Sequence, residues 1–145
     1  MADTSKAITE FFEAYAKATE SLDLAFFGSA YSDAFMFAGP DGVRVVKRDD
    51  FLRVIPKRKE FFKAAGLIAS EVGRLEETRL DEKHTIVRVH WTMRFEKNPG
   101  QPIVDESAAT YLLRQEEEAV QIVFQLDHQD LAKRVQELGL VATLG

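Results

Sequence analysis

The sequence predicts an α+β domain in which helices cover one face of a curved, mostly antiparallel sheet. In the first part of the chain, apolar residues recur every three or four positions, which is typical of amphipathic helices. After residue 66 the period changes to two, which indicates several strands that follow one another directly. A length of 145 residues fits one domain, so residues 1–145 are expected to share one core.

The first part of the chain predicts two helices and a hairpin. The helical stripe over residues 4–19 contains Tyr15, and a short apolar helix is expected over residues 23–28. Residues 31–38 and 43–47 are rich in aromatic and β-branched side chains, and they flank a Gly-Pro-Asp-Gly sequence. This sequence is a strong turn signal, so the two segments are predicted to pair as a hairpin.

The second part predicts a helix, four strands and a last helix. Helical spacing returns over residues 48–65, although Pro56 lacks a backbone donor and should kink or split that helix. A final helix is expected over residues 127–139, with Asp127 as its N-cap. Alternation is strongest in the second strand, where the odd positions from Val87 to Phe95 are all apolar. The four strands are expected at residues 67–80, 85–96, 104–114 and 120–126.

The composition excludes several classes of protein. The chain has no cysteine, which excludes disulfides, thiolate metal ligands and a cysteine nucleophile. Its net charge of -5 disfavours binding to nucleic acid or anionic membranes, and the basic residues between Arg44 and Lys63 are interpreted as a solvated helix face. No apolar run has the length of a signal peptide or a membrane span. We therefore expect a soluble, cytoplasmic protein.

Metal and nucleotide motifs are absent from the sequence. The three histidines, His84, His90 and His128, show none of the spacings typical of metal ligands. There is no Gly-x-Ser-x-Gly elbow, no Gly-x-Gly-x-x-Gly and no phosphate-binding loop that ends in Gly-Lys-Ser/Thr. We expect neither a metal nor a cofactor.

The segment from Phe26 to Gly42 (FFGSAYSDAFMFAGPDG) joins a short helix, a strand and a Gly-Pro turn. This layout resembles the nuclear transport factor 2-like superfamily over almost the whole chain. That superfamily includes ketosteroid isomerases, scytalone dehydratase, polyketide cyclases and noncatalytic association domains. The resemblance implies a cystatin-like cone, with helices on the concave face of the sheet and a pocket between them, and often a dimer through the sheet. It does not imply one activity.

The isomerases of this superfamily offer a residue-level comparison. When the sequences are aligned on the proline of the turn, the tyrosine that donates to the substrate carbonyl falls near Tyr15. The aspartate base falls on Gly39, which has no side chain to accept a proton. A positioned base contributes about 100- to 10,000-fold in rate, so the resemblance does not support isomerase activity.

Three residues are candidates for catalysis. Tyr15 is the candidate hydrogen-bond donor, or else a core aromatic. Asp33 shares a strand face with Phe35 and Phe37 if alternation holds, so it could replace the missing base at the pocket mouth, or else lie on the surface. His90 lies on the polar face of its strand between two arginines, where it could act as a neutral base or help bind an anion. Its alternative is a solvated or dimer-facing sheet surface.

Two functions remain open. The first is a cone that binds a compact hydrophobic molecule, lined by Phe35, Phe37, Trp91 and Phe124, with a carbonyl or hydroxyl of the ligand near Tyr15. Without a cofactor, the chemistry open to it is proton transfer, as in isomerisation, dehydration or aldol-type cyclisation. The alternative is a noncatalytic association domain that uses its sheet face to form a homodimer or to dock a partner protein.

Overall fold

The computed structural model describes residues 2–117 and 119–140, with side chains from Lys6 onward. The predicted α+β class and the order of the elements are confirmed. The elements are α1 (Ala2–Ser21), α2 (Leu24–Ala30), β1 (Tyr31–Gly39), β2 (Gly42–Lys47), α3 (Arg48–Ala64), β3 (Leu67–Arg79), β4 (His84–Phe95), β5 (Ile103–Glu116), β6 (Ala119–Asp127) and α4 (Leu131–Glu137).

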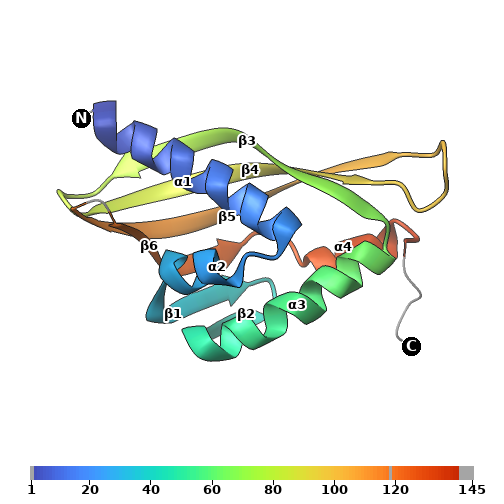
Figure 1. Ribbon diagram of the computed structural model, residues 1–145, viewed down its shortest axis with the longest axis horizontal. Coiled ribbons are helices and arrows are strands. Elements are labelled where there is room, and N and C mark those ends of the chain that lie inside the picture. The colour runs from blue at the N-terminus through green and yellow to red at the C-terminus, as the bar shows by residue number, and fades with distance from the viewer. Residues whose placement is uncertain (1, 118, 141–145) are drawn as a thin grey trace.

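Six strands form one sheet in the order β2-β1-β6-β5-β4-β3. Every neighbouring pair is antiparallel except β1 and β6, which run parallel, so the sheet is mostly antiparallel as predicted. Figure 1 shows α1, α2 and α3 together in front of the sheet, on one of its faces. The other face is left uncovered by these three helices. Within the described part of the chain, no helix combines the length and the apolar composition needed to span a bilayer.

Local signals set the helix boundaries, with two differences from the prediction. The carboxylate of Asp23 accepts a hydrogen bond from the backbone N–H of Phe26 at 3.1 Å and so caps α2. The helix ends at Ala30 rather than at Gly28. The prediction that Pro56 splits α3 is wrong, because the helix continues through it. Loss of one helical hydrogen bond there is offset by an apolar stripe that packs on both sides of the proline.

The core fills the space between the helices and the sheet. Ile8 and Phe12 of α1 are fully buried, and so are Val87 and Val89 of β4, which point toward them. Full burial of each such side chain contributes about 1.5–3 kcal/mol. A second, smaller cluster joins the end of α3 to α4. Its members are Phe62, Ala65, Met93, Phe95, Val135 and Leu140.

Candidate functional site

Three phenols meet in the interior between α1 and the sheet. Tyr15 lies on the inward stripe of α1, three residues after Phe12, and its hydroxyl is 2.8 Å from that of Tyr31 at the start of β1. The ring of Tyr111, from β5, lies 6.2 Å from that of Tyr15, and its hydroxyl interacts with Tyr15 and Trp91. The cluster therefore joins three elements that are distant in sequence.

A chain of hydrogen bonds leads from these phenols to a carboxylate. The Tyr31 hydroxyl donates to Gln125 Oε1 at 2.6 Å, and Gln125 Nε2 donates to Asp127 Oδ1 at 2.9 Å. Tyr31 has a single proton, which Gln125 already accepts, so Tyr15 must be the donor in the bond between the two phenols. The bonds thus run in one direction, from Tyr15 through Tyr31 and Gln125 to Asp127.

Burial sets the acidities in this network. Burial raises the pKa of Asp127, although the hydrogen bond from Gln125 opposes the change. Burial also raises the pKa of all three phenols, most strongly for Tyr31 and Tyr111. For Tyr15, the hydrogen bond with Tyr31 opposes this rise.

The members of the cluster differ in burial. Tyr31 is 0% exposed and Tyr111 is 2% exposed. In contrast, Tyr15, Trp91 and Asp127 are half-buried. Tyr15 and Trp91 pack their rings against the main core cluster. The polar residues of the network that are not fully buried are thus Tyr15 and Asp127.

Asp127 lies on the strand beside Gly39, the position where the sequence comparison had found no base. Its backbone oxygen lies 3.9 Å from the position of a Cβ added at Gly39, because β1 and β6 are parallel neighbours at this level. The prediction that Asp127 caps the last helix is wrong. Strand β6 continues through Asp127, and Asp130 caps α4 by accepting from a backbone N–H. The adjacent strand thus brings the backbone of Asp127 next to position 39.

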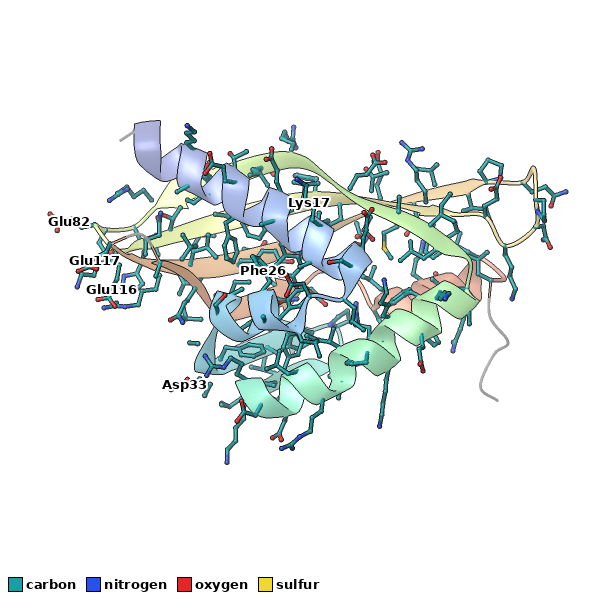
Figure 2. All side chains as sticks on the ribbon, viewed as in Figure 1. Lys17, Phe26, Asp33, Glu82, Glu116 and Glu117 are labelled. Atoms are coloured by element: carbon teal, nitrogen blue, oxygen red, sulfur yellow. The ribbon has the colours of Figure 1, made fainter. Side chains whose placement is uncertain are left out.

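Asp33 does not reach this site. Its side chain is 94% exposed and pairs with Arg48 at 2.9 Å. Figure 2 shows Asp33 at the periphery of the molecule, whereas Phe26 lies between α1 and α2. A register shift in the pairing of β1 with β6, between Tyr31 and Met36, breaks the alternation that predicted a shared face for Asp33 and Phe35.

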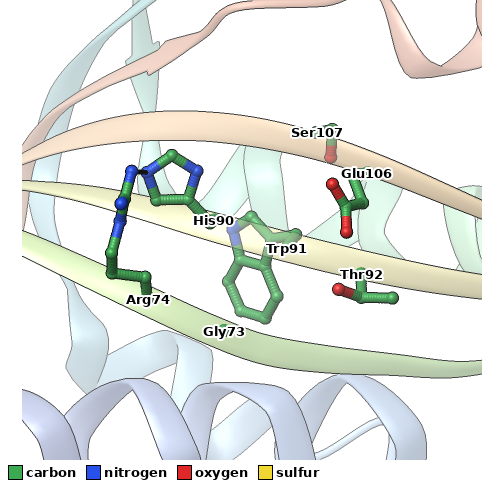
Figure 3. Close-up of a pocket in the computed structure, with 7 residues that line it drawn as sticks. All are labelled: Gly73, Arg74, His90, Trp91, Thr92, Glu106 and Ser107. Carbon is green, nitrogen blue, oxygen red and sulfur yellow. Dashed lines mark hydrogen bonds between the residues drawn. The ribbon is translucent and has the colours of Figure 1, made fainter.

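His90 lies on the polar face of β4, opposite the side chains that face the helices. Its Nε2 is 2.6 Å from Glu76 Oε2. The same atom is 3.4 Å from Nη2 of Arg74 (Figure 3). Its charged neighbours thus include a carboxylate from β3 that the sequence did not indicate. The structure does not bring His90 together with Tyr15.

A pocket of about 330 Å³ adjoins His90 at the irregular pairing of β3 with β4. Most of its polar lining comes from the uncovered face of the sheet, as Figure 3 shows. Of the residues expected to line the cone, it includes Trp91 alone. The residues that line it are Gly73, Arg74, His90, Trp91, Thr92, Glu106 and Ser107.

The predicted lining residues divide between two faces of the sheet. Phe35 is 2% exposed and packs its ring 4.6 Å from that of Tyr31, so it belongs to the core. Phe37 is half-buried on the same face. The ring of Trp91 lies 5.7 Å from that of Tyr15. Trp91 is therefore the predicted lining residue whose ring contacts Tyr15.

The prediction that Phe124 lines the cone is wrong. Its register partners are Leu112 on β5 and Met36 on β1, and these lie on the face that the helices leave uncovered. Ile122 faces the core, but a bulge follows it, so Gln125 rather than Phe124 is the next inward residue. The same bulge turns the side chain of Asp127 inward.

The described residues contain no group of three or more histidine, cysteine, aspartate or glutamate side chains placed to hold a metal ion. The chemistry that the arrangement itself offers is hydrogen bonding and proton transfer. Tyr15 has one proton, so it can donate to a ligand oxygen only in place of its bond to Tyr31. Asp127 can accept a proton.

The fold agrees with what is found among known proteins. A family model described as NTF2-like protein (DUF6841) matches residues 3–130. The chain belongs to this NTF2-like family. The predicted resemblance to the superfamily is thereby confirmed. No curated protein matches the sequence significantly.

Solved structures share the fold at low sequence identity. An NTF2-like protein with a cystatin-like fold from Novosphingobium aromaticivorans is 17% identical, with a TM-score of 0.71 over 92% of this chain and 89% of that one. Aln2 from a Streptomyces species is 12% identical, with a TM-score of 0.72 over 92% and 96%. An NTF2-like protein of unknown function from Shewanella oneidensis is 15% identical, with a TM-score of 0.69 over 87% and 99%. These likenesses establish the cystatin-like fold alone.

Proposed function

We propose that this NTF2-like domain binds a compact hydrophobic molecule in the interior of its cone, with a carbonyl or hydroxyl of the ligand against Tyr15. The observation that supports the proposal is the phenol network, in which half-buried Tyr15 and Asp127 lie with Trp91 at the edge of an apolar core. Apolar walls with a few convergent polar groups are typical of small-molecule sites.

The same arrangement suits proton transfer. Asp127 replaces Asp33 and His90 as the proposed base, because burial raises its pKa and it lies at the level of the missing carboxylate. In an enolisation, Asp127 would take the proton from the carbon next to a ligand carbonyl. The electron pair of the broken C–H bond would form the carbon–carbon double bond of the enolate, and the π pair of the carbonyl would move to its oxygen. Tyr15 would donate a hydrogen bond to that oxygen in place of its bond to Tyr31. A donor of this kind contributes about 100- to 1,000-fold in rate.

A fluorescence titration tests the binding step. Trp91 is the single tryptophan of the chain, and it lies beside Tyr15, so it can transfer energy to a bound dye. N-phenyl-1-naphthylamine, a neutral apolar dye, should bind saturably with one dye per chain. Tyr15→Phe and Asp127→Asn should weaken binding, whereas Asp33→Asn, an exposed control, should leave it unchanged. Absence of saturable binding, or equal effects of all three variants, would contradict the proposal.

A second function, association through the sheet, is favoured by a different observation. An apolar row crosses five strands in register on the uncovered face, and Val45 and Met36 within it are 69% and 42% exposed. An apolar patch of this kind suits a twofold homodimer, in which each copy covers the row of the other. The row consists of Val45, Met36, Phe124, Leu112 and Ile86.

Light scattering on a gel-filtration column tests this second function. The wild-type chain should elute as a dimer, and Met36→Asp should elute as a monomer. Val54→Asp provides the matched control, because Val54 is 50% exposed on α3, away from the row. A monomeric wild type, or a dimer that survives Met36→Asp, would count against association through this face.

A further inference from the structure

A bulge in β3 forms the hollow of the pocket beside His90. The pairing of β3 with β4 shifts between Val72 and Leu75, and both of these side chains pack against the core. Gly73 and Arg74 therefore lie together opposite His90, away from the core. Gly73 has no side chain, and an added Cβ would lie 3.1 Å from the His90 backbone oxygen. The bulge thus leaves a pocket of about 330 Å³ on the uncovered face of the sheet (Figure 3).

One end of this pocket is rich in hydrogen-bond donors. His90 Nε2 makes the one short contact of the group, 2.6 Å from Glu76 Oε2. Arg74 Nη2 lies 3.4 Å from His90 Nε2 and 3.7 Å from Glu76 Oε1, and both distances are longer than those of a strong hydrogen bond. A guanidinium has several N–H donors, so Arg74, whose side chain is 70% exposed, keeps most of them available. Arg88, 3.9 Å from the same carboxylate, adds a second positive charge.

The other end of the pocket carries a free carboxylate. Glu106 is exposed, and within the described part of the chain it has no hydrogen-bond or ion-pair partner. In contrast, the carboxylate of Glu71, which lies on the same face, pairs with Arg94 at 3.2 Å. Thr92 is the register partner of Glu106, and its hydroxyl forms no hydrogen bond with any described residue. This end therefore offers a negative charge and a hydroxyl that the protein itself does not use.

The regular pairing of β4 with β5 sets the separation of the two ends. His90 and Thr92 lie on the same face two residues apart, which corresponds to about 7 Å along a strand. Figure 3 shows Arg74 beside His90 at one end of the pocket, and Glu106 near Thr92 at the other. A positive and a negative group are thus held apart across one hollow, and they form no ion pair with each other.

We propose that this pocket binds a small zwitterion of the amino-acid class, with the ligand carboxylate at Arg74 and the ligand ammonium group at Glu106. A guanidinium binds a carboxylate through paired, charge-assisted hydrogen bonds, and a carboxylate accepts such bonds from an ammonium group. An amino acid satisfies both ends of the pocket at once, whereas a simple acid or amine satisfies one. The site lies on the opposite face of the sheet from the phenol network, so it does not depend on the proposed function.

Isothermal titration calorimetry with glycine and 4-aminobutanoate, a short and a longer zwitterion, tests the proposal. Wild-type protein should bind at least one of them saturably, with one molecule per chain. Butanoate and butylamine, which each keep a single charge, should bind at least about tenfold more weakly than the zwitterion. Arg74→Gln and Glu106→Gln should each weaken binding of the zwitterion by about tenfold or more. Both side chains are exposed, so the melting temperature of each variant should remain near that of wild type.

Arg53→Gln and Glu82→Gln are the matched controls. They remove the same charges from an exposed position of α3 and from the turn between β3 and β4, away from the pocket. Neither should change the affinity. Equal losses in the control variants would overturn the proposal, because general surface charge would then explain the binding. Butanoate that binds as tightly as 4-aminobutanoate, or absence of saturable binding for both amino acids, would also overturn it. In either case the proposed function stands, since the neutral dye tests it separately.

Discussion

Tyr31→Phe probes the hydrogen-bond chain that organises the interior. The Tyr31 hydroxyl is fully buried, accepts a hydrogen bond from Tyr15 and donates to Gln125 at 2.6 Å. The substitution keeps the ring, so the contacts with Phe35 and Phe51, at 4.6 and 4.7 Å between ring centres, are preserved. The change therefore isolates the effect of the hydroxyl.

The expected loss follows from what the hydroxyl leaves behind. A typical hydrogen bond contributes about 0.5–1.5 kcal/mol net, and a buried acceptor left without a partner costs about 1–3 kcal/mol. Gln125 is 7% exposed, so its carbonyl would find little solvent to replace the lost donor. We expect Tyr31→Phe to lower the free energy of unfolding by about 2–3 kcal/mol.

Urea unfolding followed by Trp91 fluorescence measures the change. With a denaturant slope of about 2 kcal/mol per M, the midpoint should fall by about 1–1.5 M. Tyr15→Phe is the control, because solvent reaches Tyr15 and its loss leaves the bond between Tyr31 and Gln125 intact; it should cost about 1 kcal/mol. The directed network would be refuted if Tyr31→Phe lowered the free energy of unfolding by less than about 0.5 kcal/mol. It would also be refuted if Tyr15→Phe lowered that free energy more than Tyr31→Phe does.

Three further changes test other parts of the structure. The raised pKa of Asp127 means that the folded state disfavours the ionised carboxylate, which lowers the free energy of unfolding. This loss of stability is absent below the pKa of Asp127 in the unfolded chain, near 4. It grows as the pH rises from there through the pKa in the folded state. In urea unfolding, Asp127→Asn should therefore gain stability relative to wild type as the pH rises from 4 to 7. A stability difference between the two proteins that does not change with pH would contradict the raised pKa of Asp127. Gly66 has φ +93° and an added Cβ would lie 2.7 Å from the Lys97 nitrogen, so Gly66→Ala should lower the melting temperature by several degrees. Asp23→Ala removes the cap on Phe26 and should cost about 0.5–2 kcal/mol in the same urea assay, with no loss if the cap is unimportant.

Much of the fold could be predicted because local signals and tertiary structure agree. The helical stripe that contains Tyr15, the turn at Gly39 and the alternation in β4 each matched the element that forms. Pro56 is the exception in α3, because packing on both sides of the proline outweighs one missing hydrogen bond. Only the packed structure reveals that balance.

The site was harder to predict because it depends on strand irregularities. Regular alternation along β6 places Phe124 inward and Asp127 outward, but the bulge after Ile122 reverses both. Nothing in one sequence marks that extra residue. Likewise, Tyr31 and Tyr111 are ordinary strand aromatics until the sheet brings them next to Tyr15. A polar pair two residues apart at the end of an apolar strand, Gln125 and Asp127, is the one signal that could have indicated an inward polar site.

The central claim is that Asp127 is a ligand-accessible interior carboxyl, and carbon-13 NMR of the aspartate side chains tests it most directly. We predict that the Asp127 carboxyl titrates above the ordinary value of an aspartate, and that its midpoint moves when N-phenyl-1-naphthylamine saturates the protein. An Asp127 signal that titrates at the ordinary value and ignores the dye would contradict the account.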